Sequence, residues 1–151
     1  MALKLYLDTS ALLKLYILEP ESKDLIARLR RQRGRILVTP LHELELSSAV
    51  SQRVFRRESS ISERDETLAE FESDLQGGTY VRPALAWASV LAAAARLAKT
   101  HSVKTGVRSI DALHVASALA SEADRFLTFD KRQHALALAV GLKVGRAPSR
   151  R

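Results

Sequence analysis

Residues 3–18, LKLYLDTSALLKLYIL, decide the fold of this chain. Residues 3–7 form a short apolar run typical of a buried strand, and residues 11–18 continue with apolar positions at helical spacing. Asp8-Thr9-Ser10 stands between them, where a Ser or Thr is a natural N-cap. The stretch therefore predicts a strand, a turn and a helix, with the Asp8 carboxylate directly at the end of the strand.

The rest of the chain repeats this alternation. Further short strands are predicted at residues 36–38, 79–81 and 126–129, with an edge strand at 142–144. Helices are predicted at residues 21–31, 40–57, 62–75, 83–99, 109–122 and 131–140. Short apolar strands separated by helices indicate a parallel sheet covered on both faces, with right-handed crossovers. We therefore expect an α/β fold of three layers around a short central parallel sheet.

Length and composition favour one compact domain. The 151 residues are 46% hydrophobic and include only 6 Gly and 4 Pro, so a sizeable core is available and no linker divides the chain. We expect a single domain over residues 1–145 and a basic tail at 146–151. The absence of cysteine excludes disulfides, thiolate zinc sites and thiol nucleophiles. Without a secretory signal or a long apolar span, we expect a cytoplasmic protein that does not enter a membrane.

The net charge of +7 favours polyanionic partners, because Lys and Arg replace the counterions condensed on phosphate backbones. Arginines gather at residues 28–35, 53–57 and 146–151. Solvated helix faces and a basic tail account equally well for any one of these clusters. The charge alone therefore does not separate a nucleic-acid partner from a plain basic surface.

Four acids stand singly in apolar or small-residue surroundings: Asp8, Glu45, Asp111 and Asp130. Carboxylates are rarely kept in such surroundings without a cation, and no Lys or Arg recurs beside all four. Asp8 and Asp130 each follow the last apolar residue of a strand, so they should meet at one edge of the sheet. Simpler explanations remain for each: the two Asp cap helices, Asp111 complements a helix dipole, and Glu45 pairs with Arg53.

The glutamate of this set has a competitor in the same predicted helix. At a hundred degrees per residue, Glu45 lies on an apolar-to-small face with Leu41 and Ser48, whereas Glu43 points nearly opposite. Glu45 is the better inward candidate. The helix is apolar around much of its circumference, which indicates a subunit or partner interface.

The segments YLDTSALLKLY, TPLHELELSSAV, RSIDALHVASALA and FLTFDKRQHALALAVGL together resemble the PIN-domain family of metal-dependent ribonucleases. The similarity is strongest to the toxins of VapBC-type toxin–antitoxin pairs. It implies a PIN-like fold, a Mg²⁺ or Mn²⁺ ion, hydrolysis of RNA phosphodiester bonds, a homodimer, and an antitoxin that blocks the cleft. Hard dications suit such chemistry because they prefer oxygen ligands, activate water and neutralise phosphate charge.

Carried onto this sequence, the resemblance assigns the catalytic acids to Asp8, Glu45, Asp111 and Asp130. We expect Asp8, Asp111 and Asp130 to bind the metal, with Glu45 completing its shell or activating the attacking water. Polar support is assigned to the neighbours Thr9, Ser10 and Thr128, and Arg108 contacts the scissile phosphate or neutralises nearby carboxylates. We interpret His42 and His114 as packing residues outside the site.

Two other classes remain open. A housekeeping or catalytically silent PIN-domain RNA-binding protein would share the fold without the toxin role. A receiver domain or a haloacid-dehalogenase-like phosphatase is also an aspartate-rich α/β protein. Both of these need a further acid close to the first one, and Asp8 is instead followed by Thr9 and Ser10. The sequence thus favours the nuclease over this last class.

Overall fold

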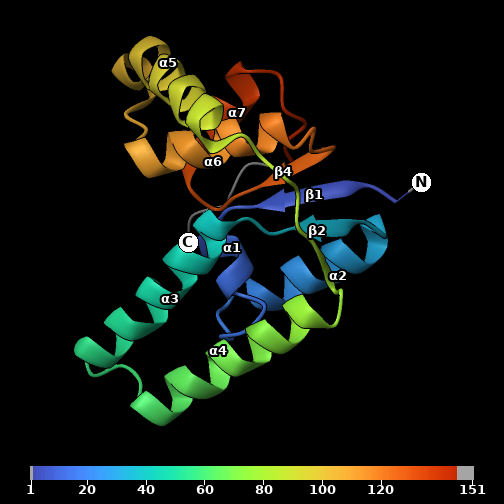
Figure 1. The fold of residues 1–151 in the computed structure, drawn as a ribbon, viewed down its shortest axis with the longest axis vertical. Coiled ribbons are helices and arrows are strands. Elements are labelled where there is room, and N and C mark those ends of the chain that lie inside the picture. The colour runs from blue at the N-terminus through green and yellow to red at the C-terminus, as the bar shows by residue number, and fades with distance from the viewer. Residues whose placement is uncertain (1, 146–151) are drawn as a thin grey trace.

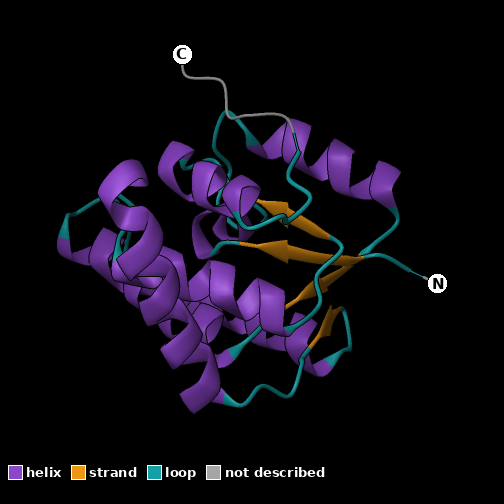
Figure 2. Ribbon diagram, turned by 90° about the horizontal axis from the view of Figure 1, so that it is seen from above, coloured by secondary structure: helices purple, strands orange, loops and turns teal. Residues whose placement is uncertain are grey.

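The computed structural model describes residues 2–145, which form one parallel four-stranded sheet with helices on both faces (Figures 1 and 2). The strand order is β3-β2-β1-β4, and all three neighbouring pairs are parallel. The strands are β1 (Lys4–Leu7), β2 (Arg35–Leu37), β3 (Tyr80–Val81) and β4 (Arg125–Leu127). This architecture confirms the predicted three-layer α/β fold. The predicted tail at 146–151 lies outside the described residues.

Seven helices are found within residues 2–145. They are α1 (Thr9–Leu13), α2 (Ser22–Gln32), α3 (Pro40–Phe55), α4 (Ile61–Gln76), α5 (Trp87–Thr105), α6 (Ser109–Ala120) and α7 (Lys131–Ala139). The first four lie below the sheet in Figure 1 and the last three lie above it. None of the described helices is long and apolar enough to cross a membrane.

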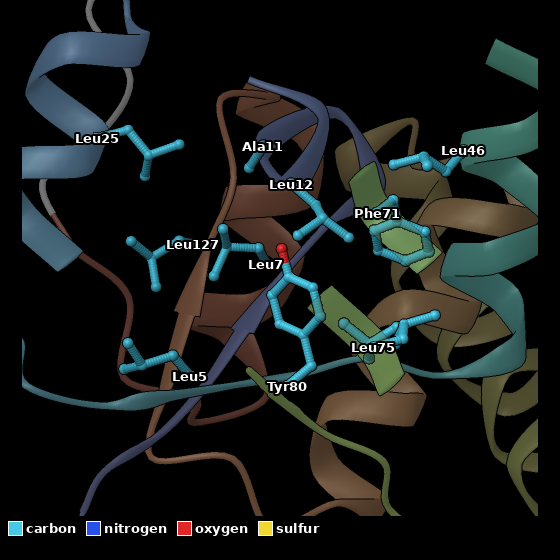
Figure 3. Close-up of a cluster of buried hydrophobic side chains, with 11 residues drawn as sticks. Leu5, Leu7, Ala11, Leu12, Leu25, Leu46, Phe71, Leu75, Tyr80 and Leu127 are labelled. Carbon is cyan, nitrogen blue, oxygen red and sulfur yellow. The ribbon is translucent and has the colours of Figure 1, made fainter. Parts of the chain in front are cut away.

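The central strand β1 divides the core into two layers. Leu5 and Leu7 pack on one face with side chains of α1, α2 and α4, the cluster drawn in Figure 3. Tyr6 faces the other way and packs with Phe126 and with α6 and α7. Leu5, Tyr6 and Leu7 are at most 1% exposed, because alternate residues of a doubly covered strand point to opposite buried layers.

Two helices differ from their predicted extents. The helix expected at 11–18 ends at Leu13, and its N-cap is Asp8 rather than Thr9 or Ser10. The helix expected at 83–99 begins at Trp87 and continues to Thr105. In its last turn the Thr105 hydroxyl donates to the His101 carbonyl at 3.0 Å. Gly106 then ends the helix in the left-handed conformation at φ 69°.

The predicted edge strand at 142–144 is reduced to a single parallel bridge between Val144 and Phe126. The acid Asp124 directly precedes β4 and is partly buried, and its Oδ2 accepts the Lys4 backbone N–H at 2.7 Å. This contact joins β1 and β4 at the end of the sheet where the strands begin.

Candidate active site

Asp8 lies at the carboxyl end of β1, beside the end of β4. Its side chain is only 5% exposed, and its Oδ1 accepts the Ala11 backbone N–H at 2.8 Å. Its Oδ2 accepts the Thr128 hydroxyl at 2.7 Å. Burial raises the pKa of Asp8 above its ordinary value and outweighs these two hydrogen bonds, and the charge of Asp111 adds to the rise. A buried carboxylate of this kind is stabilised by a cation.

Thr128 connects Asp8 to Asp130. The hydroxyl that donates to Asp8 also accepts the Asp130 backbone N–H at 3.0 Å. The exposed Asp130 carboxylate in turn accepts the Gln133 backbone N–H at 2.9 Å and so caps α7. Both Asp8 and Asp130 are therefore helix caps as well as members of one hydrogen-bonded chain, and the capping explanation does not exclude the site explanation.

Asp111, in the first turn of α6, lies within electrostatic reach of the other three acids. Burial raises the pKa of Asp111, and the charge of Asp130 and, more weakly, that of Glu45 raise it further. Asp111 also raises the pKa of Asp8. Asp111 in the first turn of α6 and Glu45 in the second turn of α3 thus lie near Asp8 and Asp130 at the carboxyl edge of the sheet.

Glu45 is held by two donors at this edge. Its Oε1 accepts the Thr9 hydroxyl at 2.7 Å and bonds with the His114 ring. Burial alone would raise the pKa of Glu45, but the hydrogen bond and proximity of His114, together with Thr9, hold it below its ordinary value. Glu43 instead pairs with Arg82 on the surface, with 2.8 Å between Nη2 and Oε2. The alternative partner Arg53 pairs with Glu58.

His114 is a site residue that the sequence interpretation missed. It is 2% exposed, and its Nε2 contacts both Glu45 and the Thr9 hydroxyl, the latter at 3.2 Å. Its Nδ1 lies 2.8 Å from the Tyr6 hydroxyl. The position of His114 three residues after Asp111 in the same helix was the available signal, because such residues share a helix face.

His42 is a packing residue, as interpreted from the sequence. Its Nε2–H donates to the Leu7 carbonyl at 2.7 Å, and its Nδ1 accepts the Thr39 backbone N–H at 3.0 Å. Burial lowers the pKa of His42 to about 3, so the ring is neutral near pH 7. His42 therefore fixes the carbonyl immediately before Asp8 without adding a charge.

Two of the expected supporting residues lie at the rim. Ser10 is exposed and makes no side-chain hydrogen bond with another described residue. Arg108 is exposed at the N-terminus of α6, and its charge lowers the pKa of Asp111 in opposition to burial. Arg108 is thus within electrostatic reach of Asp111.

The donor set fits a hard divalent cation. Asp8, Asp111 and Asp130 offer only oxygen, and none of them forms an ion pair with a Lys or Arg among residues 2–145. The arrangement does not by itself define a coordination shell. No three His, Asp or Glu side chains of the described chain are grouped so that they could hold one ion together. Carboxylates repel one another, and those of Asp8, Asp130 and Glu45 each accept a hydrogen bond from a protein donor.

Fold and site together define an α/β protein with a carboxylate cluster at the carboxyl edge of a parallel sheet. The chain matches the PIN domain family over residues 5–138, and it therefore belongs to that family. PIN domains are generally nucleases, and PIN nucleases typically use a divalent metal.

Two solved structures share the fold. One is the crystal structure of VapBC2 from Rickettsia felis bound to a DNA fragment from their promoter. It is 16% identical, has a TM-score of 0.64, and the alignment covers 95% of this chain and 98% of that one. The other is FitAcB from Neisseria gonorrhoeae, also 16% identical, with a TM-score of 0.59 and coverage of 93% and 95%. A comparison with curated proteins found no match.

Proposed function

We propose that this protein is a Mg²⁺- or Mn²⁺-dependent endoribonuclease, acting in the cytoplasm as the toxin of a type II toxin–antitoxin pair. The observation that carries the proposal is the buried Asp8 carboxylate. It has a raised pKa and no Lys or Arg ion-pair partner among the described residues, and Thr128 joins it to Asp130. Such a carboxylate at the ligand-binding edge of a PIN domain is best explained by a dication.

The residues divide the work of phosphodiester hydrolysis. Asp8, Asp111 and Asp130 would hold the dication, which when bound neutralises phosphate charge and lowers the pKa of water. Glu45 stays ionised near neutral pH because its pKa is lowered, so it can accept the proton of the attacking water. Thr9 and His114 fix the Glu45 carboxylate, and Arg108 binds a substrate phosphate from the rim.

The toxin role rests on two further observations. The sequence resembles VapBC-type toxins along nearly its whole length, and the similar structures, VapBC2 and FitAcB, are of toxin–antitoxin type. In addition, α3 presents Leu44 and Phe55 to solvent, 70% and 88% exposed. Large apolar side chains on the surface are typical of interaction sites. We propose a homodimer, and an antitoxin that presents a basic group to the acids.

The nuclease proposal is tested with purified protein and a mixed RNA substrate. EDTA should stop cleavage, and Mn²⁺ or Mg²⁺ added in excess of the chelator should restore it. Cleavage that continues at full rate in EDTA would exclude the proposed chemistry. RNA binding without cleavage under every metal condition would favour the silent or housekeeping PIN protein instead.

The toxin proposal needs a separate experiment in cells. Induced expression of the protein should arrest growth, and co-expression of the small reading frame next to its gene should relieve the arrest. An active nuclease that leaves growth unaffected would contradict the toxin role while leaving the nuclease proposal intact.

A further inference from the structure

Gln133, in the first turn of α7, makes hydrogen bonds to two acid-bearing residues. Its backbone N–H donates to Asp130 Oδ1 at 2.9 Å. Its side-chain Nε2–H donates to the Asp111 backbone carbonyl at 3.2 Å. The Gln133 residue is 0% exposed, and the two hydrogen bonds are partly buried. One buried residue therefore connects the start of α6 to the start of α7.

With Thr128, Gln133 completes a continuous chain of hydrogen bonds between three of the acids. Thr128 donates to Asp8 and accepts from the Asp130 backbone. Gln133 then continues the chain from the Asp130 carboxylate to the Asp111 carbonyl. Of the three residues expected to bind the metal, Asp8 follows β1, Asp130 follows β4 and Asp111 lies in α6, and this chain connects those elements.

Helix stability alone does not explain an amide at this position. The Asp111 carbonyl lies inside α6, where the helix's own ladder supplies a donor, so the bond from Gln133 is additional. The Gln133 Oε1 is buried with no hydrogen-bond donor among residues 2–145. An unpartnered buried oxygen is costly, and a Met of similar volume would avoid that cost. The amide therefore serves the spacing of the acids rather than the packing.

We infer that Gln133 is a positioning residue that sets the distance between Asp111 and Asp130 for dication binding. The inference rests on the proposed function, because it assigns Gln133 a role in the same site. Residues that orient metal ligands commonly change affinity by about 10- to 100-fold when replaced, although they do not touch the ion. Among the atoms proposed to bind the metal, Gln133 contacts only Asp130 Oδ1, and we assign it no contact with the substrate.

The test is Gln133→Met in the full-length protein, with Mn²⁺ binding followed by isothermal titration calorimetry in the absence of RNA. We expect Mn²⁺ affinity to fall about tenfold while the midpoint of thermal unfolding stays the same or rises. In RNA cleavage, the variant should need about tenfold more Mn²⁺ for half-maximal rate, with the KM for RNA unchanged. A role in packing alone would lower thermal stability and leave the metal requirement unaltered.

Ser121→Ala is the matched control. Ser121 is also a buried polar residue, 7% exposed, whose hydroxyl donates to a helix carbonyl, that of Ser117. It lies at the opposite end of α6 from Asp111, so its replacement should not change Mn²⁺ affinity. Gln133→Asn is the second variant if the Met protein does not fold, because its shorter amide keeps the polarity but does not reach Asp111.

The outcomes separate the inference from the proposed function. Weaker Mn²⁺ binding in either Gln133 variant, with normal binding in Ser121→Ala, supports the positioning role. Unchanged Mn²⁺ affinity in a folded Gln133 variant overturns it, while the nuclease proposal stands. A wild-type protein that binds no Mn²⁺ overturns both.

Discussion

At the residue scale, the buried charge of Asp8 lowers the stability of the folded protein. Its pKa is raised by burial, so the folded protein takes up a proton at Asp8 more readily than the unfolded chain does. Asp8 therefore contributes its full stabilisation of the folded state at pH values below its pKa in the unfolded chain. That stabilisation is lost as pH rises through the pKa of Asp8 in the folded protein. At neutral pH the ionised carboxylate is therefore a stability cost that a bound dication would offset.

Asp8→Asn should abolish RNA cleavage and raise the midpoint of thermal unfolding at pH 7. Asn keeps an acceptor for the Ala11 N–H but carries no charge to desolvate. The difference in unfolding midpoint between the variant and wild type should shrink as pH falls toward 4, since wild-type Asp8 is then protonated. Calorimetric unfolding across pH 4 to 8, with and without Mn²⁺, checks this. A variant that is active, or that Mn²⁺ stabilises as much as it does wild type, would refute the ligand role.

The two glutamates of α3 offer a matched pair. Glu45→Gln should lower kcat by about 100-fold or more, because the amide cannot accept a proton from the attacking water. Glu43→Gln should leave kcat near wild type, since Glu43 pairs only with Arg82 at the surface. Single-turnover cleavage of one RNA by both variants is the measurement. Equal losses in the two would show that neither glutamate has the proposed role.

At the scale of elements, His42 connects α3 to the end of β1 and makes that connection sensitive to acid. Its folded pKa is about 3, against an ordinary value of 6.5, so protons bind the unfolded chain first as pH falls. The contribution of His42 to stability is complete above pH 6.5 and is lost as pH falls from there toward 3. The shift corresponds to a few kcal/mol, taken as an order of magnitude.

His42→Gln should test this connection. The variant should be less stable than wild type at pH 8 by about 1–3 kcal/mol, because it loses the hydrogen bond to the Leu7 carbonyl or the ring packing. Its free energy of unfolding should also depend less on pH between 6.5 and 4. Urea unfolding at several pH values measures both quantities. Parallel pH profiles for the two proteins would contradict the assigned neutral histidine.

The elements that the sequence predicted well are those set by local pattern. The apolar run at 3–7 is buried on both faces, so its composition alone identifies β1 as a central strand. The extent of α1 was not predictable in this way. Helix α1 ends at Leu13. The next residue, Lys14, is buried, and its Nζ lies 2.5 Å from Oε2 of Glu19, which belongs to the segment after the turn. From the sequence alone, Gly34 indicates the end of a helix. The structure adds a packing reason for glycine there, because a Cβ would lie 2.5 Å from Leu5 Cγ.

At the scale of the whole molecule, the positions of the acids and of their polar neighbours Thr9 and Thr128 could be predicted, but the contact with His114 could not. Parallel strands bring their carboxyl ends to one edge, so the positions of Asp8 and Asp130 followed from topology. The His114–Glu45 bond joins residues 69 positions apart, and no local pattern encodes it. The Glu45 carboxylate and Asp8 Oδ2 are oriented by such distant donors, which is why the sequence indicated the site but not all of its hydrogen bonds.

The charge of the whole molecule predicts a salt-dependent affinity for RNA. With a net charge of +7, binding should release counterions, and each phosphate contacted contributes about −0.7 to the slope of log affinity against log salt. For about three phosphates, affinity should fall roughly 20-fold between 50 and 200 mM salt. Fluorescence anisotropy of labelled RNA with the cleavage-deficient Asp8→Asn protein measures the slope.

Arg108 gives this prediction a residue-level control. Placed beside Asp111 at the rim, it should contribute one phosphate contact, so Arg108→Ala in the same background should reduce the slope by about 0.7. Arg64→Ala removes the same charge from α4, where Arg64 pairs with Asp65 at 2.9 Å, and should leave the slope unchanged. Equal slopes for both variants would mean that RNA senses only the overall charge, and that Arg108 has no specific part in binding it.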